Sequence, residues 1–186
     1  MKRGRLVLVV GPSGAGKDTL IRGARDALAD EPGFIFPRRV ITRASSADEE
    51  SIEIDRERFA ALAAEGAFAL HWEAHGLAYG LPGTIAAALA EGRIVVANVS
   101  RAVLGEARDR FEESFIVEVT ASDAELARRL AQRARPEDGD LNRRFARRAQ
   151  ALPVRPDARI LNEGAPEEAT ARFVELLRNL TGAHAV

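Results

Sequence analysis

Residues 5–20, RLVLVVGPSGAGKDTL, combine three features that suit the binding of phosphate groups: an apolar run, a glycine-rich turn and the start of a helical pattern. Glycines let the backbone curl so that successive N–H groups point inward at anionic oxygens, and a helix start presents its positive end to the same anion. A lysine in the turn adds a mobile charge that follows the β- and γ-phosphates. The spacing G-x4-G-K between a strand and a helix is a Walker A loop. It predicts a nucleoside triphosphate site at Gly11, Pro12, Ser13, Gly14, Ala15, Gly16, Lys17, Asp18 and Thr19.

The position after the Walker A lysine normally carries Ser or Thr, whose hydroxyl binds Mg²⁺. Here that position is Asp18, and Thr19 follows one residue later. Asp18 has two interpretations: it ligates the metal directly or through water, or it is a favourable acid in the first turn of a helix. We favour a Mg²⁺ site at Asp18, with Thr19 as the other candidate ligand.

The composition describes an ordinary globular protein: 186 residues, 46% hydrophobic and 30% charged, enough for one well-buried domain. A net charge of −1 provides no basic surplus for general nucleic-acid binding. There is no cysteine, which excludes disulfides and thiolate metal sites. The apolar run at 6–10 is too short for a signal peptide or a membrane span. We therefore expect a cytoplasmic protein with neither a nucleic-acid nor a membrane partner.

Strand-like and helix-like segments alternate along the chain. Runs rich in Val and Ile, typical of parallel strands covered on both faces, occur at 5–10, 94–99 and 115–120. Further strands are expected at 40–42, 68–73 and 158–161, and helices at 17–29, 55–65, 83–91, 102–111, 124–134, 141–150 and 166–180. Ser122 and Glu125 form a capping-box pattern, and Gly66 and Gly92 stand where helices end. The alternation predicts an α/β fold with a doubly wound, mostly parallel sheet, and the Walker A loop makes it one of the P-loop NTPase type.

Two stretches depart from this alternation. Residues 34–82 combine several short strands with one helix, and residues 128–148 contain eight arginines interrupted by a Pro-Glu-Asp-Gly-Asp hinge at 136–140. Phosphoryl transfer requires cations around the transferring group and loops that exclude water. We therefore expect a single domain over 1–186 with three parts. They are a core (1–33, 83–127 and 151–186), an acceptor-binding insert at about 34–82, and an arginine-rich lid at about 128–150.

Taken together, these segments resemble the guanylate kinase family over nearly the full chain. The matching pieces are GPSGAGKDTL at 11–20, ITR at 41–43, E-G-x-F leading into H-G-x-x-Y-G-x-P at 65–82, and the lid arginines. More narrowly, GKD at 16–18, RxITR at 39–43 and N-x-SR at 98–101 resemble the ribose 1,5-bisphosphate phosphokinases of phosphonate catabolism. That resemblance implies the use of ATP and Mg²⁺ to convert a sugar bisphosphate into 5-phosphoribosyl 1-diphosphate (PRPP).

The resemblance also indicates which acceptor features differ. Guanylate kinases read guanine with two acidic residues, and an ungapped alignment on the H-G-x-x-Y-G block places Leu70 and Asn98 there. The loop ASSADEESIEI lacks the family's tyrosine. A site that hydrogen-bonds a base rejects ligands without partner groups, and a leucine cannot pair with guanine N–H groups. Arg43 keeps the family's phosphate arginine, while Arg39 replaces a serine and offsets the second arginine, which is Ser46 here. We expect phosphate recognition without base recognition.

The remaining roles follow from the same resemblance. Lys17 contacts the β- and γ-phosphates, and the lid arginines Arg133 and Arg144 close on the phosphates of both substrates. Asn162 matches a position near the adenine. The acceptor-binding candidates are Arg39, Arg43, Glu73, Tyr79, Asn98, Ser100, Arg101 and Arg147. His71, Glu73 and His75 alternate along one strand, but three ligands without a fourth are weak evidence for a metal.

Other functions remain open from the sequence. A divergent guanylate kinase is disfavoured by Leu70 and Asn98. A non-catalytic guanylate kinase-like interaction module is disfavoured by the intact Gly16-Lys17 pair and the lid arginines. A GTPase switch would need a guanine-reading N-K-x-D motif, which we do not find. The sequence leaves both a monomer and a homodimer open.

Overall fold

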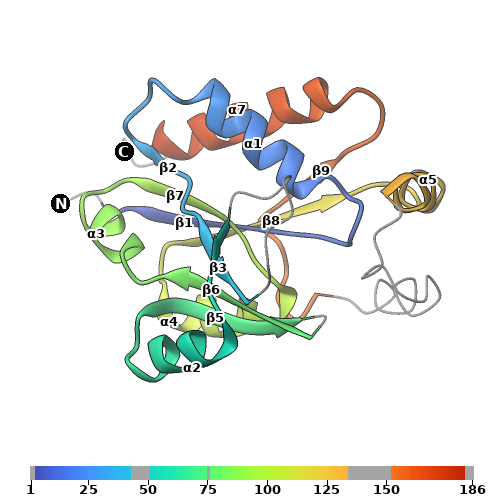
Figure 1. Ribbon diagram of the computed structural model, residues 1–186. Helices are drawn as coiled ribbons and strands as arrows, with labels where there is room; N and C mark the ends of the chain where they lie inside the picture. The colour runs from blue at the N-terminus through green and yellow to red at the C-terminus, as the bar shows by residue number, and fades with distance from the viewer. Residues whose placement is uncertain (1–2, 43–50, 75, 134–151, 183–186) are drawn as a thin grey trace.

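The computed structural model describes residues 3–42, 51–74, 76–133 and 152–182 (Figure 1). The expected helix at 141–150 and most of the expected lid lie outside these residues. Among the described helices, none is long and apolar enough to cross a membrane.

The central sheet has five strands in the order β2-β7-β1-β8-β9, and every pairing is parallel. The strands are β1 (Arg5–Val10), β2 (Phe34–Ile35), β7 (Ile94–Asn98), β8 (Ser114–Thr120) and β9 (Ala158–Leu161). The three continuous apolar runs of the sequence are the three inner strands, as expected for strands buried on both faces. The predicted α/β fold with a parallel sheet is confirmed.

Helices cover both faces of this sheet, and β1 shows how the two faces divide. Val7 and Val9 face α1 (Lys17–Ala27) and α7 (Pro166–Gly182), which lie side by side above the sheet in Figure 1. The alternate residues of β1 face a second apolar cluster on the opposite side, because successive strand residues point to opposite faces. That side is covered by α3 (Ile85–Ala90), η1 (Arg101–Val103), α4 (Leu104–Arg110) and part of a second sheet.

The second sheet has four strands in the order β4-β3-β6-β5. They are β3 (Arg39–Ile41), β4 (Ser51–Glu53), β5 (Phe68–Ala74) and β6 (Leu77–Pro82). One face joins the core beneath the central sheet through Leu70, Trp72 and Leu81. The other face packs on α2 (Arg56–Ala64) in a separate small cluster. Residues 34 and 35, which the sequence groups with the insert, pair with β7 in the central sheet instead.

The expected helix ends are correct at two positions and partly wrong at a third. Gly66 and Gly92 follow α2 and α3 with positive φ angles of 72° and 80°. Before α5 (Asp123–Arg133), the Ser122 hydroxyl accepts the Glu125 N–H at 3.4 Å, which is half of a capping box. The other half is absent, because the Ser122 N–H donates to the Glu163 carboxylate at 2.7 Å. The Glu125 carboxylate binds two arginines instead.

Candidate active site

The Walker A segment forms a tight loop between β1 and α1, and two positions in this loop accept only glycine. Gly11 and Gly16 have φ angles of 149° and 86°. A Cβ atom on Gly11 would lie 2.1 Å from the Val119 carbonyl oxygen, and one on Gly16 would lie 2.3 Å from the Asn162 amide nitrogen. The N-cap residue of α1 is Gly16, which forms no side-chain cap hydrogen bond, and the helix begins directly after the loop. This arrangement suits an anion at the helix start.

Lys17, the first residue of α1, places its ammonium over the loop. The Nζ atom donates to the carbonyl oxygens of Gly11 at 2.9 Å and Pro12 at 3.0 Å. A lysine ammonium is a compact charge on a flexible stem, so small rotations of the stem redirect it toward phosphate oxygens bound in the loop. The contact with β- and γ-phosphates stays a prediction.

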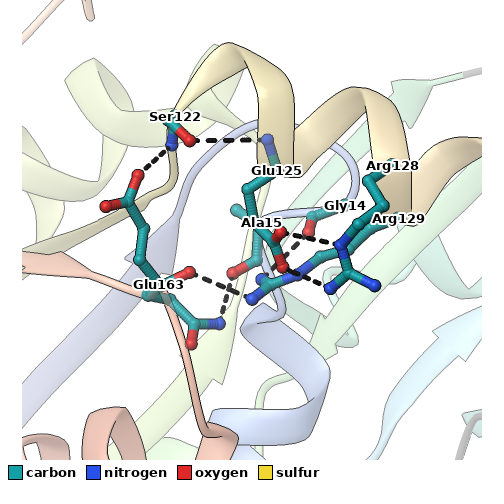
Figure 2. Close-up of polar contacts among 8 residues, drawn as sticks. Gly14, Ala15, Ser122, Glu125, Arg128, Arg129 and Glu163 are labelled. Carbon is teal, nitrogen blue, oxygen red and sulfur yellow. Dashed lines mark hydrogen bonds and ion pairs between the residues drawn. The ribbon is translucent and has the colours of Figure 1, made fainter.

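Arg129 of α5 contacts the phosphate loop and the residue that follows β9. The sequence places Arg129 in the expected lid, so this supporting role was not predicted. Its Nε donates to the Glu125 carboxylate at 2.6 Å, and one terminal nitrogen donates to the Asn162 carbonyl oxygen at 3.1 Å. The other terminal nitrogen lies 3.5 Å from the Gly14 carbonyl oxygen, at the limit of a hydrogen bond. Figure 2 shows Glu125 and Arg129 of one helix converging on the loop segment that carries Gly14. The four-residue spacing of Glu125 and Arg129 was the available signal.

Asn162, just after β9, supports the same loop. Its side chain is buried, and its amide nitrogen donates to the Ala15 carbonyl oxygen at 2.7 Å. Its amide oxygen has no hydrogen-bond partner among the described residues. The structure therefore places Asn162 beneath the phosphate loop, where it supports the loop's shape. The contact with adenine that the resemblance implies stays a prediction.

The contacts of Glu125 with Arg128 and Arg129 give a pH-dependent prediction. Hydrogen bonds from Arg128 and then Arg129 lower the pKa of Glu125 from 4.5 to about 2. A carboxylate with a lowered folded-state pKa adds stability above its unfolded pKa and loses it as pH falls toward the folded value. We therefore expect Glu125→Gln to melt below the wild type at about pH 7, and the difference to shrink between about pH 4.5 and pH 2. Thermal denaturation across pH measures this.

The matched control is Glu106→Gln, which removes an exposed pair with Arg110 on α4, remote from the loop. We expect Glu125→Gln to raise the KM for ATP a few-fold, roughly the effect of one ordinary hydrogen bond, because Glu125 contacts the loop only through Arg129, and Glu106→Gln to leave it unchanged. Equal KM values in both variants would show that Glu125 does not support nucleotide binding.

A second set of side chains lies beside the loop, around Arg39 of β3. The Arg39 guanidinium lies 5.8 Å from the centroid of the Tyr79 ring, and Tyr79 stacks on Trp72 at 5.6 Å and 5°. Arg39 forms an ion pair with Asp18 at 3.7 Å, and only 18% of its side chain is exposed. Its guanidinium donates no hydrogen bond to a described residue. The structure thus brings together Arg39 and Tyr79, two of the predicted acceptor-binding residues.

The carboxyl end of β7 adds Asn98 to this group. Asn98 pairs in register with Val9, so it lies beside the strand end from which the phosphate loop starts. Its amide nitrogen donates to Asp18 Oδ1 at 2.6 Å. Two further predicted acceptor-binding residues, Ser100 and Arg101, follow this strand end. The Ser100 hydroxyl caps η1 by accepting the Ala102 N–H at 3.3 Å, and Arg101 is half-buried in that turn.

Comparison with known proteins shows the family of this chain. A protein from Methylobacterium radiotolerans described as ribose 1,5-bisphosphate phosphokinase PhnN is 54% identical over 175 residues, which are 94% of this chain and 98% of that protein. The chain belongs to the ribose 1,5-bisphosphate phosphokinase family. A second relative with the same description, from Rhodopseudomonas palustris, is 48% identical over 95% of this chain and 89% of that protein. No protein-family model matches the chain.

The fold of this phosphokinase is shared with guanylate kinases, as the motifs implied. The guanylate kinase from Anaplasma phagocytophilum superposes with a TM-score of 0.70 at 21% identity, covering 97% of this chain and 87% of that one. Leu70, which the alignment on the H-G-x-x-Y-G block predicts to replace a guanine-reading acid, is completely buried among apolar side chains of the central core.

One predicted acceptor residue lies apart from the others in this phosphokinase. Glu73 follows Trp72 on β5, so its side chain points to the opposite face of the second sheet from Trp72 and Tyr79. It forms an ion pair with Arg56 of α2 at 3.1 Å, and 74% of its side chain is exposed. The structure does not bring Glu73 to the Arg39 group. His71, on the same outer face, lies beside Phe59 and Phe68.

Five further candidates of the phosphokinase cannot be placed around the site. Arg43, Arg144, Arg147 and His75 lie outside the described residues, as does the side chain of Arg133, whose backbone ends α5. Within the described part of the chain, no group of three or more histidines and acids converges as a metal site.

Proposed function

We propose that this phosphokinase transfers the γ-phosphoryl group of ATP to ribose 1,5-bisphosphate, giving 5-phospho-α-D-ribose 1-diphosphate and ADP in the cytoplasm. The relatives' descriptions support the substrate class. The observation that carries the acceptor site is Arg39, a largely buried guanidinium that forms one ion pair, 3.7 Å long, with the described residues and donates to no described acceptor. A guanidinium with unused donors in a fixed plane suits bidentate contact with a phosphate.

The chemistry needs positioning and charge more than a base. An oxygen of the acceptor's 1-phosphate attacks the γ-phosphorus in line, a new P–O bond forms, and the bond to the β–γ bridging oxygen breaks to release ADP. The attacking oxygen is already anionic, so no strong general base is required. Lys17 and the loop N–H groups hold the β- and γ-phosphates, and we propose that Arg133 and Arg144 supply further positive charge.

Mg²⁺ is part of this proposal, because it neutralises the charge of the β- and γ-phosphates when bound. The two predicted protein ligands fit it poorly. Oδ1 of Asp18 already accepts from Asn98 and lies near the Arg39 cation. Thr19 is exposed and lines a groove between α1 and α7. Mg²⁺ usually keeps several waters and takes phosphate oxygens as ligands, so we propose that the nucleotide supplies most of its coordination.

Phosphorus NMR with Mg-ATP tests the function on ribose 1,5-bisphosphate and GMP side by side. We expect a new diphosphate signal on the sugar and no GDP. GDP formation would contradict the proposal and indicate a guanylate kinase. Absence of transfer to either acceptor, in a sample that binds ATP, would also contradict it and favour another acceptor or an interaction module.

A further inference from the structure

We propose that Asp18 is a positioning residue that ties the acceptor-binding groups Arg39 and Asn98 to the phosphate loop. This inference rests on the proposed function, because it assumes that Arg39 holds a phosphate of the acceptor. It assigns the acid after the Walker A lysine a task other than binding Mg²⁺.

The contacts of one oxygen atom carry the proposal. Asp18 Oδ1 accepts from the Asn98 amide at 2.6 Å and pairs with the Arg39 guanidinium at 3.7 Å. These side chains come from three separate elements: the first turn of α1, the carboxyl end of β7 and strand β3 of the second sheet. Asp18 also directly follows Lys17, the expected ligand of the β- and γ-phosphates. A single carboxylate therefore connects the donor side of the site with the acceptor side.

Arg39 is held from a second direction by aromatic rings. Its guanidinium lies over Tyr79, and Tyr79 stacks on Trp72, which is buried in the core. Ring and carboxylate together fix the plane of the guanidinium, while the long ion pair leaves donor groups available to an anion. The contact with Asp18 thus orients Arg39 without saturating it.

The acid itself is needed for this arrangement. A Ser or Thr hydroxyl in this position acts through short hydrogen bonds, whereas the contact with Arg39 is 3.7 Å long and depends on opposite charges. In-line transfer is sensitive to misplacement of about 1 Å. A link between the sheet that carries Arg39 and the loop that carries Lys17 therefore holds ATP and the acceptor in the correct positions relative to each other.

The test separates positioning from metal binding by measuring acceptor affinity without metal or nucleotide. Binding of ribose 1,5-bisphosphate is measured by calorimetry in EDTA for the wild type and Asp18→Asn. The amide is isosteric and still accepts from Asn98, but it lacks the charge that holds Arg39. We expect about tenfold weaker binding of ribose 1,5-bisphosphate, equivalent to roughly 1.4 kcal/mol.

Three further variants make the outcome decisive. Asp18→Ser restores the usual P-loop residue: it recovers activity if Asp18 serves Mg²⁺, and it binds the acceptor as weakly as Asp18→Asn if Asp18 positions Arg39. Asp26→Asn, on the same helix and paired with Arg25, is the matched control and should change nothing. With Arg39→Ala, the Asp18→Asn effect on acceptor affinity should disappear, because the two residues act as one unit.

Each result has a separate meaning. Wild-type protein that fails to bind ribose 1,5-bisphosphate contradicts the proposed function. Wild-type binding with unchanged affinity in Asp18→Asn overturns the positioning role alone, as does full activity in Asp18→Ser. Melting temperatures of both Asp18 variants establish that the comparison is made on folded protein.

Discussion

Replacement of Lys17 by methionine is expected to lower kcat by about 10²–10³-fold, the typical loss when one electrostatic stabiliser of the transition state is removed. Methionine keeps the length of the side chain but removes the charge that follows the β- and γ-phosphates. The charge matters most when the γ-phosphoryl group is in transit, so kcat should fall more than affinity for ATP. Steady-state transfer from ATP to ribose 1,5-bisphosphate measures the effect.

The low lysine content of the chain allows an independent test of the contact between Lys17 and ATP. The sequence has two lysines, Lys2 and Lys17, among 27 basic residues. Amine acetylation followed by mass spectrometry therefore reports on Lys17 almost alone, and ATP should protect it. Because Lys17 also donates to two loop carbonyl groups, the melting temperature of the variant must be measured alongside. A folded variant with less than a tenfold loss in kcat would show that Lys17 does not stabilise the transferring group.

The elements that the sequence predicts well are those with a strong local signal. β1, β7 and β8 are continuous apolar runs, and the phosphate loop is a contiguous motif, so both are readable without tertiary information. β2 and β4 span two and three residues, and β6 contains Gly80 and ends at Pro82. Such segments carry too little periodicity to be assigned singly, and their pairing depends on the rest of the second sheet.

The acceptor side was predictable only in part, because its geometry depends on which residues face each other across strands. Arg39 and Tyr79 meet because β3 pairs with β6, which no spacing in the sequence reveals. For Glu73 the sequence did contain a usable signal. The residue after a buried tryptophan on a strand points to the opposite face of the sheet, away from that tryptophan. Arg129 and Glu125 carried a helical pair signal, but their contact with the phosphate loop appears only in three dimensions.

Arg39→Ala should produce the second large effect, this time on the acceptor. Loss of two charge-assisted hydrogen bonds, each contributing about 1.5–3 kcal/mol, predicts a fall in kcat/KM for ribose 1,5-bisphosphate of about 10²-fold or more. Most of the change should appear in the acceptor KM, while the KM for ATP stays within about twofold, because Arg39 lies on the acceptor side of the loop. Initial rates at varied acceptor and fixed ATP measure both constants.

The neighbouring arginine supplies the control for this prediction. Arg38→Ala removes the same charge one residue away, but Arg38 is exposed and donates to the Ser51 carbonyl oxygen at 2.9 Å, on the other side of the strand. A general loss of positive charge would weaken acceptor binding similarly in both variants, since both carry the same net charge. A specific phosphate contact affects Arg39→Ala alone. Equal losses in the two variants would therefore remove Arg39 from the acceptor site and leave long-range attraction as the explanation.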